Sequence, residues 1–388
     1  MQTNKSKKIM LIGGHLTPAL ATLSELQNRG YSNFIWVGKK HVQTASSAES
    51  PEYKLITAQN IPFISFKAGK IWRKWTLKTL GKALYNLLLI PAGFIHALFI
   101  LIVHRPRIVV SFGGYIALPL VIAAKVLFIK SVTHEQTLTS GLANRLIAKF
   151  ADRILISWEK TKSIFMQSKV AFTGNPIRRE VLENTTNIIN FNNSLPVIYV
   201  TGGNQGANTI NWRLREFLPQ LLEKANVIHQ TGNSTLTNDY QKSLALKKSL
   251  PKELSERYLV WDNIFGNEIG EIFAKADLLV SRSGANTVTE ILATGKLSVL
   301  IPIPWASQNE QLLNANLVAD TGLGFVLEQY DEMQPQELFD AINLGLDALN
   351  NNQGFNKVPL NECKEKASKL IKMDASMLIV DELERLID

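Results

Sequence analysis

The chain has 388 residues, a single cysteine at Cys363 and a formal charge of +9. This length exceeds one ordinary hydrophobic core and predicts two domains of about 150 to 200 residues each. One cysteine excludes a disulfide framework and a cysteine-rich zinc site, and it favours a reducing compartment. Because Lys5, Lys7 and Lys8 lead directly into a short strand, we expect no secretory signal here.

The first half of the chain alternates short apolar strands with helices. Strands are expected at residues 9–12, 34–37, 108–110, 132–133, 153–157 and 170–172, with helices after the first glycine pair, over 116–128 and after Ser140. This alternation predicts a doubly wound parallel sheet whose ligands bind at the carboxyl ends of the strands.

The second half begins again at Pro196 with strands expected at 197–200, 227–229, 259–261, 278–281 and 299–301. We expect the hinge near Asn175, where Gly174-Asn175-Pro176 interrupts the alternation. The last helix, over 373–387, could belong to either half.

Three of these strands run into a paired-glycine turn that opens a helix: Gly13-Gly14, Gly113-Gly114 and Gly202-Gly203. Glycine lets backbone N–H groups approach an anion closely, and the helix N-terminus offers its positive end. Each turn is therefore a candidate phosphate cradle.

His15 follows the first glycine pair, with Thr17 expected as the N-cap and Pro18 as the first helical residue. At the mouth of the turn, a neutral imidazole could take a proton from an acceptor hydroxyl. The alternative is a histidine that only caps the turn.

The block from Arg282 to Glu290 is the most specific in the second half. It follows a strand, turns at Ser283-Gly284 and should open a helix near Asn286, so that amides at Thr287 face a diphosphate. Glu290, one turn later, could accept both hydroxyls of a ribose. Taken alone, Glu290 could equally be a helix residue facing solvent.

Two further polar groups lie after strands. Gln308 to Gln311 could bind sugar hydroxyls, or could simply form a helix N-terminus capped by Ser307. His134 and Glu135 suggest a metal site, but no Asp-x-Asp pair or second histidine cluster accompanies them. We therefore predict no metal.

Basic and apolar residues are concentrated between Glu52 and Glu135, a stretch with eleven lysines and arginines and no acidic residue. Trp72 and Trp75 lie among these cations, and residues 83–103 that follow are almost wholly apolar. This combination favours a membrane surface over a nucleic acid. A spanning helix is disfavoured by Asn86, Pro91 and His96, and a helix pair covering a sheet is the remaining alternative.

Seven motifs in order resemble the MurG-type glycosyltransferases of family 28: GGHLTPALA, SFGGYIALP, THEQTLTSGLANRLIAKFAD, FTGNPIRREV, VTGGNQGANTIN, ADLLVSRSGANTVTEI and QNEQLLNA. The resemblance implies a GT-B fold, with two doubly wound Rossmann-like domains facing a cleft. These would be residues 1–174 with helix 366–388, which receive the acceptor, and residues 175–365, which bind the UDP-sugar.

The family resemblance also implies the reaction. N-acetylglucosamine would pass from UDP-N-acetylglucosamine, with inversion and without a metal, to the muramoyl 4-hydroxyl of an undecaprenyl-diphospho-pentapeptide acceptor. The protein would act peripherally at the cytoplasmic face of an anionic membrane, without nucleic acid and with possible protein partners of cell-wall synthesis.

Carried over to this sequence, the resemblance makes His15 the general base. The UDP-sugar would be bound by Gly13, Gly14, Thr137, Arg178, Asn204, Phe265, Gly266, Ala285, Asn286, Thr287, Val288, Thr289, Glu290 and Gln311. The acceptor diphosphate would lie near Gly113, Gly114, Tyr115, His134 and Glu135, and the membrane would contact Trp72, Lys74, Trp75 and Lys78.

The chain departs from the family at two places. It has only IGGH where GGTGGH is common, and Thr137 stands where an asparagine is usual. We interpret both as variation within the activity. The alternatives are a diacylglycerol glycosyltransferase of the same fold, a UDP-N-acetylglucosamine 2-epimerase, and a catalytically silent membrane-docking subunit.

Overall fold

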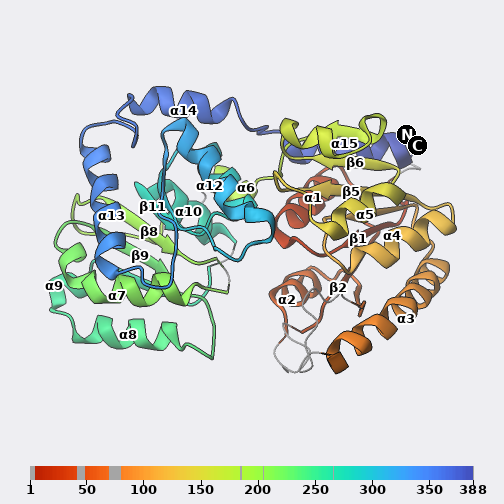
Figure 1. Ribbon diagram of the computed structural model, residues 1–388, viewed down its shortest axis with the longest axis horizontal. Coiled ribbons are helices and arrows are strands. Elements are labelled where there is room, and N and C mark those ends of the chain that lie inside the picture. Colours follow the sequence, from red (N-terminus) through yellow and green to blue (C-terminus); the bar gives the residue numbers. More distant parts are fainter. Residues whose placement is uncertain are drawn as a thin grey trace. The chain divides into compact units, whose positions relative to one another are not determined.

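A computed structural model describes residues 5–41, 49–69, 80–183, 186–203, 205–264 and 266–387, with the backbone alone at 82 and 83. The chain forms two compact units, Met1–Pro176 with Met373–Asp388, and Ile177–Lys372 (Figure 1). The boundary thus lies close to the expected hinge. Residues 366–372, which we expected with the first domain, belong to the second unit.

The first unit contains a seven-stranded, wholly parallel sheet in the order β3-β2-β1-β4-β5-β6-β7. Its strands are β1 (Ile9–Ile12), β2 (Phe34–Gly38), β3 (Phe63–Ser65), β4 (Ile108–Ser111), β5 (Lys130–Glu135), β6 (Arg153–Ile156) and β7 (Val170–Phe172). The edge strand β3 is an addition to the predicted set. It is three residues long, Pro62 precedes it and its residues are partly or fully exposed, so the apolar pattern is interrupted there.

Helices cover both faces of this sheet, because alternate residues of each strand point to opposite sides. From β1, Ile9 and Leu11 pack with α1, α2 and α15, whereas Met10 and Ile12 pack with α3, α4 and α5. The helices are α1 (Leu16–Asn28), α2 (Pro51–Ala58), α3 (Leu80–His104), α4 (Ala117–Val126), α5 (Leu142–Phe150) and α15 (Ala375–Ile387), with short 3-10 turns at Glu159–Ile164 and Gln167–Lys169.

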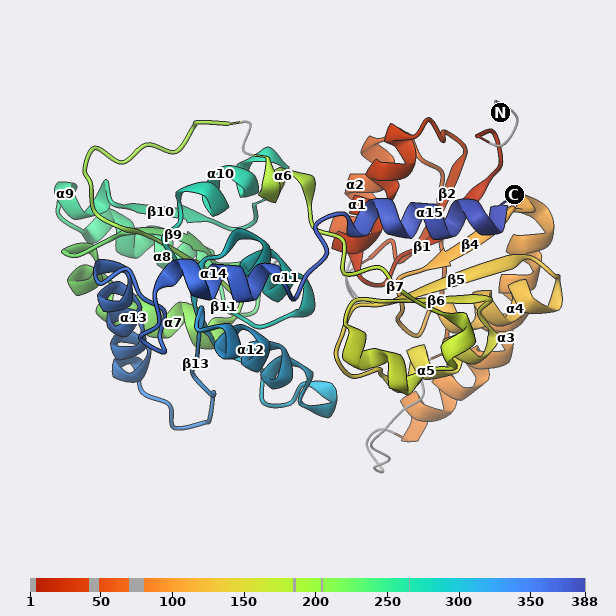
Figure 2. The ribbon, with the colours of Figure 1, turned by 90° about the horizontal axis from the view of Figure 1, so that it is seen from above.

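The last helix, α15, belongs to the core of the first unit. Ile379, Val380, Leu383 and Ile387 are buried in the same cluster as β1 and α1. Arg153 of β6 also binds Glu382, with 2.6 Å between Nε and Oε2. Figure 2 shows α15, in dark blue, beside α1 and over the strands of this unit.

One helix, α3, has a large apolar face in contact with solvent. Ala97, Ile100 and Leu101 pack into the core, whereas Ile95 and Phe99 are 66% and 64% exposed. In the part of the chain that the structure describes, Leu84–His104 is long and apolar enough to cross a membrane by length and composition. The helix pair that was the alternative interpretation is instead one continuous helix, with Pro91 inside it.

The second unit contains a six-stranded parallel sheet in the order β10-β9-β8-β11-β12-β13. Its strands are β8 (Val197–Thr201), β9 (Asn226–Gln230), β10 (Tyr258–Trp261), β11 (Leu278–Ser281), β12 (Leu297–Leu300) and β13 (Gly324–Val326). The edge strand β13 was not expected from the sequence.

The helices of the second unit begin and end at recognisable signals. In α13, Gln334 and Glu337 form a capping box on either side of Pro335, and the C-cap residue of α11 is Gly295, whose φ is +61°. The helices are α6 (Arg179–Leu182), α7 (Asn208–Leu222), α8 (Asp239–Ser249), α9 (Lys252–Ser255), α10 (Asn267–Lys275), α11 (Ala285–Thr294), α12 (Glu310–Thr321), α13 (Pro335–Asn350) and α14 (Leu360–Ser368), with a 3-10 turn at Ser307–Asn309.

Candidate functional site

His15 lies at the carboxyl end of β1, at the N-cap position of α1. Thr17, expected to be the N-cap, is inside the helix instead, so that prediction was wrong. The imidazole is exposed and forms no capping hydrogen bond. Although the residue is exposed at the surface, nearby protein desolvates the charged ring and lowers the pKa of His15, while the Glu135 carboxylate opposes this shift. A neutral ring near pH 7 can accept a proton.

Gly13 and Gly14 are required by close packing on both sides of the first turn. A side chain on Gly13 would overlap the Glu52 carboxylate, and a side chain on Gly14 would overlap the Gly113 carbonyl. Gly13 N–H itself donates to the Val37 carbonyl at 2.8 Å. The lack of a side chain therefore serves the packing of a carboxylate and of the second turn.

The Glu52 carboxylate is fixed at this edge by two donors. Trp36 Nε1 donates to Oε1 at 2.7 Å, and the Lys39 backbone N–H donates to Oε2 at 3.3 Å. Burial raises the pKa of Glu52, although these donors and the Lys39 charge partly counteract it. The first turn therefore packs against a carboxyl group whose raised pKa favours its neutral form.

The second turn has two successive glycines in the left-handed region, Gly113 at φ +82° and Gly114 at +83°. Their amides are already engaged: Gly113 N–H donates to Ser111 Oγ at 3.1 Å, and Gly114 N–H donates to Asn144 Oδ1 at 3.2 Å. Next to this turn, Lys39 Nζ lies 4.5 Å from the centre of the Tyr115 ring. The exposed positive group here is thus the Lys39 ammonium.

Glu135 holds this edge of the first unit together from a buried position. Its Oε2 accepts from Asn144 Nδ2 at 2.9 Å, and its Oε1 accepts from Thr137 Oγ1 at 2.8 Å and Thr137 N at 3.2 Å. The chain Glu135–Asn144–Gly114 fixes the second turn. Thr137, which stands where the family has asparagine, points its hydroxyl at this carboxylate.

His134 is completely surrounded by protein. Its Nε2 donates to the Gly174 carbonyl at 2.9 Å, and burial lowers its pKa to about 4. It therefore stays neutral at physiological pH and joins β5 to the segment that leaves the first unit.

In the second unit, α11 brings together the residues expected to hold the nucleotide. The helix begins at Ala285 after Gly284, one residue before the expected start, and Ala285, Val288, Thr289 and Glu290 are buried, with Asn286 and Thr287 partly exposed. The first turn of a helix has N–H groups without intrahelical acceptors. This end of α11 is suited to a diphosphate.

Glu290 is 3% exposed, so the reading of it as a solvent-facing residue was wrong. Arg178 Nε and Nη2 donate to its two oxygens at 2.6 and 2.8 Å. Burial alone would lower the pKa of Arg178, but the Glu290 carboxylate outweighs this and raises it. The two residues expected to contact the nucleotide separately form one bidentate ion pair.

Gln311 and Ser283 are joined at the start of α12. Ser283 Oγ donates to the Gln311 carbonyl at 2.7 Å, and Gln311 Oε1 accepts from Ile303 N at 3.1 Å. Asn314 Nδ2 donates to the Ser283 carbonyl at 3.2 Å. These bonds fix the loop after β12 against the α11 turn, and the Gln311 NH₂ group is a donor suited to sugar oxygens. Ser307 is not the N-cap residue that we expected. Ala306 is the N-cap residue of the 3-10 turn that begins at Ser307, and Asn309 is the N-cap residue of α12.

The third glycine turn differs from a simple amide cradle. Gly203 N–H donates to Thr201 Oγ1 at 3.0 Å, and Gly206 N–H donates to the Gly203 carbonyl at 2.9 Å. Gly266, expected near the uracil, has φ +63° and is the N-cap of α10. Asn204, Phe265, Trp72, Lys74, Trp75 and Lys78 lie outside the described residues.

Sequence reasoning missed four residues that lie near the carboxyl ends of the strands in the two sheets. Glu52, Lys39 and Asn144 lie in unremarkable helix or loop positions, and Arg213 lies within a helical pattern. Only Asn144 had a signal, since it falls inside one of the family motifs. In the part of the chain that is described, no three His, Cys, Asp or Glu side chains gather as a metal site.

Comparison with known proteins gives a consistent result over nearly the whole chain. The glycosyltransferase family 28 N-terminal domain model matches residues 12–156, and the corresponding C-terminal domain model matches residues 197–372. Two curated relatives are named UDP-N-acetylglucosamine--N-acetylmuramyl-(pentapeptide) pyrophosphoryl-undecaprenol N-acetylglucosamine transferase. One, from Clostridium botulinum, is 33% identical over 92% of this chain and 96% of its own length, and the other, from Clostridium perfringens, is 32% identical over 87% and 90%.

Among solved structures, MurG of Acinetobacter baumannii has a TM-score of 0.64 at 25% identity, with 98% of this chain and 99% of that chain covered. A UDP-GlcNAc 2-epimerase of Methanocaldococcus jannaschii, at 13% identity and a TM-score of 0.61 over 97% and 99%, shares the fold alone. The expected GT-B fold is therefore confirmed. The chain belongs to glycosyltransferase family 28 and, within it, to the MurG-type N-acetylglucosaminyltransferases.

Proposed function

We propose that this protein transfers N-acetylglucosamine from UDP-N-acetylglucosamine to the muramoyl 4-hydroxyl of an undecaprenyl-diphospho-pentapeptide. The observation that carries the proposal is the pair of Arg178 with Glu290, one turn into α11, in a chain related to such transferases over both units. A buried, oriented carboxylate next to a helix N-terminus suits a ribose joined to a diphosphate.

His15 is the proposed general base. Its neutral imidazole takes the proton of the acceptor 4-hydroxyl as that oxygen bonds to the anomeric carbon of the donor. The bond from the anomeric carbon to the diphosphate oxygen breaks, UDP leaves with the electron pair, and the configuration at that carbon is inverted. His15 belongs to the first unit and the proposed donor residues belong to the second.

The leaving diphosphate gains negative charge during this step, and positive groups stabilise it. We propose that the amides of Asn286 and Thr287 in the first turn of α11 supply part of this stabilisation, without a metal ion. Gln311 and the 285–290 segment would orient the sugar and the ribose. Gly13 and Gly14 would contact the donor sugar or the acceptor diphosphate, and their lack of side chains permits the packing of Glu52 and Gly113 beside them.

The acceptor is proposed to be approached from a membrane surface through the exposed face of α3. Leu84, Leu88, Ile95, Phe99 and Ile102 are each more than half exposed. Arg105 and Arg107 follow the helix and add positive charge for anionic headgroups. We propose peripheral attachment at the cytoplasmic face, together with Trp72, Lys74, Trp75 and Lys78 from the preceding segment.

The test is transfer of label from UDP-N-acetylglucosamine by the full chain in detergent. Three reactions are compared: one with the muramoyl-pentapeptide lipid, one with diacylglycerol and one without an acceptor. Labelled product with the muramoyl lipid alone supports the proposal. Glycosylated diacylglycerol, release of the free 2-epimer, or the absence of turnover in all three contradicts it.

A further inference from the structure

Two arginines are buried at the carboxyl edge of the second unit. Arg282 is 9% exposed and Arg213, on α7, is 3% exposed. Arg282 directly follows β11, whose Ser281 pairs in register with Thr201 of β8. Arg282 therefore leaves the sheet beside Gly202, the first residue of the third glycine turn.

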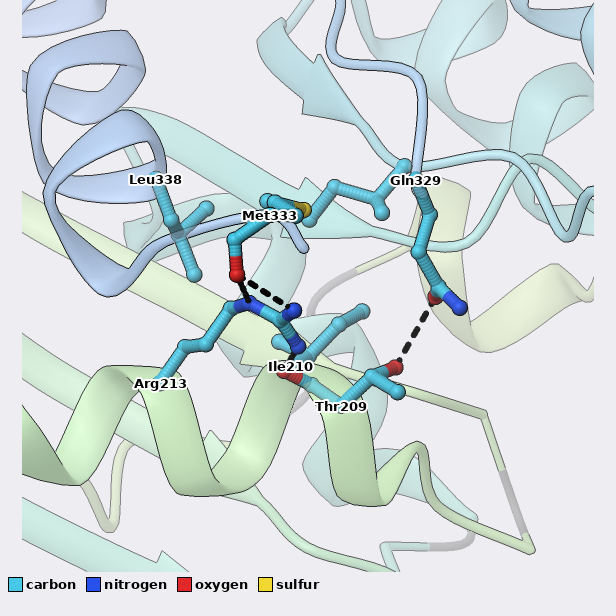
Figure 3. Close-up of a pocket in the computed structure, with 7 residues that line it drawn as sticks. Thr209, Ile210, Arg213, Gln329, Met333 and Leu338 are labelled. Atoms are coloured by element: carbon cyan, nitrogen blue, oxygen red, sulfur yellow. Dashed lines mark hydrogen bonds between the residues drawn. The ribbon is translucent and has the colours of Figure 1, made fainter. Parts of the chain in front are cut away.

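The two guanidinium groups converge on Thr209 in the first turn of α7. Arg282 Nη2 donates to Thr209 Oγ1 at 2.6 Å and to Gln329 Oε1 at 2.7 Å, and its Nη1 donates to the Ile301 carbonyl at 2.9 Å. Arg213 Nη1 donates to the Thr209 carbonyl at 2.9 Å. Its Nε and Nη2 both donate to the Met333 carbonyl, at 3.1 and 2.7 Å (Figure 3).

All of these acceptors are neutral, so the charge of the pair is not balanced. No carboxylate within the described ranges lies at ion-pair distance from either guanidinium. Glu337 is the acidic group that acts on Arg213, but it is partly exposed, lies beyond ion-pair distance and accepts from the Tyr330 hydroxyl at 2.6 Å. Arg215, on the same helix, is by contrast paired with Asp239 at 3.0 Å.

Arg282 shows the cost of this arrangement. Its Nε is buried and has no hydrogen-bond partner among the described residues. Burial, and then the charge of Arg213, lower the pKa of Arg282 to about 10. Two buried like charges without a counter-ion destabilise a protein, unless an anion that binds there supplies the missing charge.

We propose that Arg282 and Arg213 are positioning residues that form a built-in positive charge beside the first turn of α7 and hold the diphosphate of the donor electrostatically. They also fix the first turn of α7, whose N-terminus points to the same edge of the sheet. This inference rests on the proposed function in taking the anion to be the diphosphate of a UDP-sugar.

The experiment is calorimetric titration of the full chain with UDP, uridine and inorganic pyrophosphate. The variants are Arg282→Gln, which keeps a polar group but removes the charge, and Arg282→Lys, which keeps the charge. Arg257→Gln is the control, since Arg257 donates to the Leu222 carbonyl at the opposite end of α7. It removes one charge from the same unit.

In Arg282→Gln, we expect about a tenfold loss of affinity for UDP and pyrophosphate and less than about a twofold change for uridine. Arg282→Lys should retain most of the UDP affinity, and Arg257→Gln should match the wild type. A merely structural role would weaken UDP and uridine equally, or would make lysine as damaging as glutamine. Either result overturns the inference.

Circular dichroism of each variant checks that it folds. If Arg282→Gln does not fold, Arg213→Gln and Arg213→Lys carry the same comparison. Two outcomes separate this inference from the proposed function. If the wild type binds UDP and Arg282→Gln binds it equally well, only the present inference is overturned and the proposed function is not. If the wild type binds pyrophosphate in a way that depends on Arg282 but binds neither UDP nor uridine, the nucleotide assignment is overturned and the anion site is supported.

Discussion

Arg178 holds Glu290 through two parallel hydrogen bonds, from Nε to Oε1 at 2.6 Å and from Nη2 to Oε2 at 2.8 Å. A bidentate guanidinium fixes both the position and the plane of a carboxylate. Each Glu290 oxygen keeps a further lone pair that can accept a hydroxyl. Arg178 is therefore expected to orient Glu290 as well as to approach the nucleotide.

Glu290→Ala should lower the free energy of unfolding by about 3 kcal/mol, because it leaves the Arg178 charge without its partner in a largely buried site. Urea denaturation measures this change. Glu183→Ala is the matched control: it breaks the Arg179–Glu183 pair, whose side chains are 65% and 55% exposed, and should cost less than about 0.5 kcal/mol. An equal loss in the free energy of unfolding for the two variants would contradict the prediction that the Arg178–Glu290 pair is the buried one.

The ribose role of Glu290 is tested by comparing UDP with 2′-deoxy-UDP. If Glu290 accepts ribose hydroxyls, the wild type should bind UDP more tightly than the deoxy compound by about tenfold, and Glu290→Gln should narrow this ratio. An unchanged ratio in the variant would remove Glu290 from the ribose site.

His15→Ala should lower kcat by about 100-fold or more while leaving the dissociation constant of UDP unchanged. The lowered pKa of His15 also predicts the pH profile. Only the neutral ring accepts a proton, so kcat/KM should rise with pH through a midpoint below the ordinary value of 6.5. This acidic limb should vanish in the variant. A wild-type kcat retained by His15→Ala would exclude the residue as the base.

Gly13→Ala should destabilise the first unit strongly, because the new methyl group would overlap the Glu52 carboxylate. We expect a loss of about 2 kcal/mol or more in the free energy of unfolding. In a Glu52→Ala background the same substitution should cost much less, since the overlapping group is gone. A double-mutant cycle with no coupling would contradict the contact.

Glu52 also predicts a pH dependence of stability. Its pKa is raised in the folded protein, so the folded state binds this proton more tightly than the unfolded chain does. Stability from this group is present at low pH and is lost as pH rises from 4.5 through the raised pKa. Glu52→Gln should flatten this part of the pH profile of unfolding.

Replacing Ile95, Phe99 and Ile102 together with serine should reduce sedimentation with vesicles that contain anionic lipid. These side chains are exposed, so we expect folding to be retained while apolar contact with lipid is lost. Leu236→Ser with Leu344→Ser is the control, because both residues are exposed in the second unit. Equal sedimentation of all variants would exclude the α3 face as the attachment surface.

The parallel sheets were predictable because most of their strands are apolar runs followed by turns. The exceptions, β3 and β13, are three-residue edge strands with partly exposed residues. Pro62 precedes β3 and Gly324 begins β13, so the local pattern of strand-forming residues is broken at both places, unlike at the edge strand β7.

The site residues were predictable only in part, for a similar reason. Position after a strand correctly placed His15 in the turn that follows β1, and Glu290 in the helix that follows β11. It did not reveal that Glu290 is paired with a residue 112 positions away, or that a carboxylate from α2 lies against Gly13. Burial and the choice of hydrogen-bond partner are set by tertiary packing, so the sequence alone could not give them. The catalytic roles of His15 and Glu290 stay predictions.

The return of α15 to the first unit has a consequence during biosynthesis. Residues 1–176 emerge from the ribosome first, yet that segment lacks Ile379, Leu383 and their neighbours until α15 has been synthesised. At about 5 to 20 residues per second, the nascent segment waits roughly ten seconds or more with an open apolar surface. The second unit, although translated later, can thus fold before the first. A stop codon that removes only the last turns of α15 would destabilise the unit that is translated first.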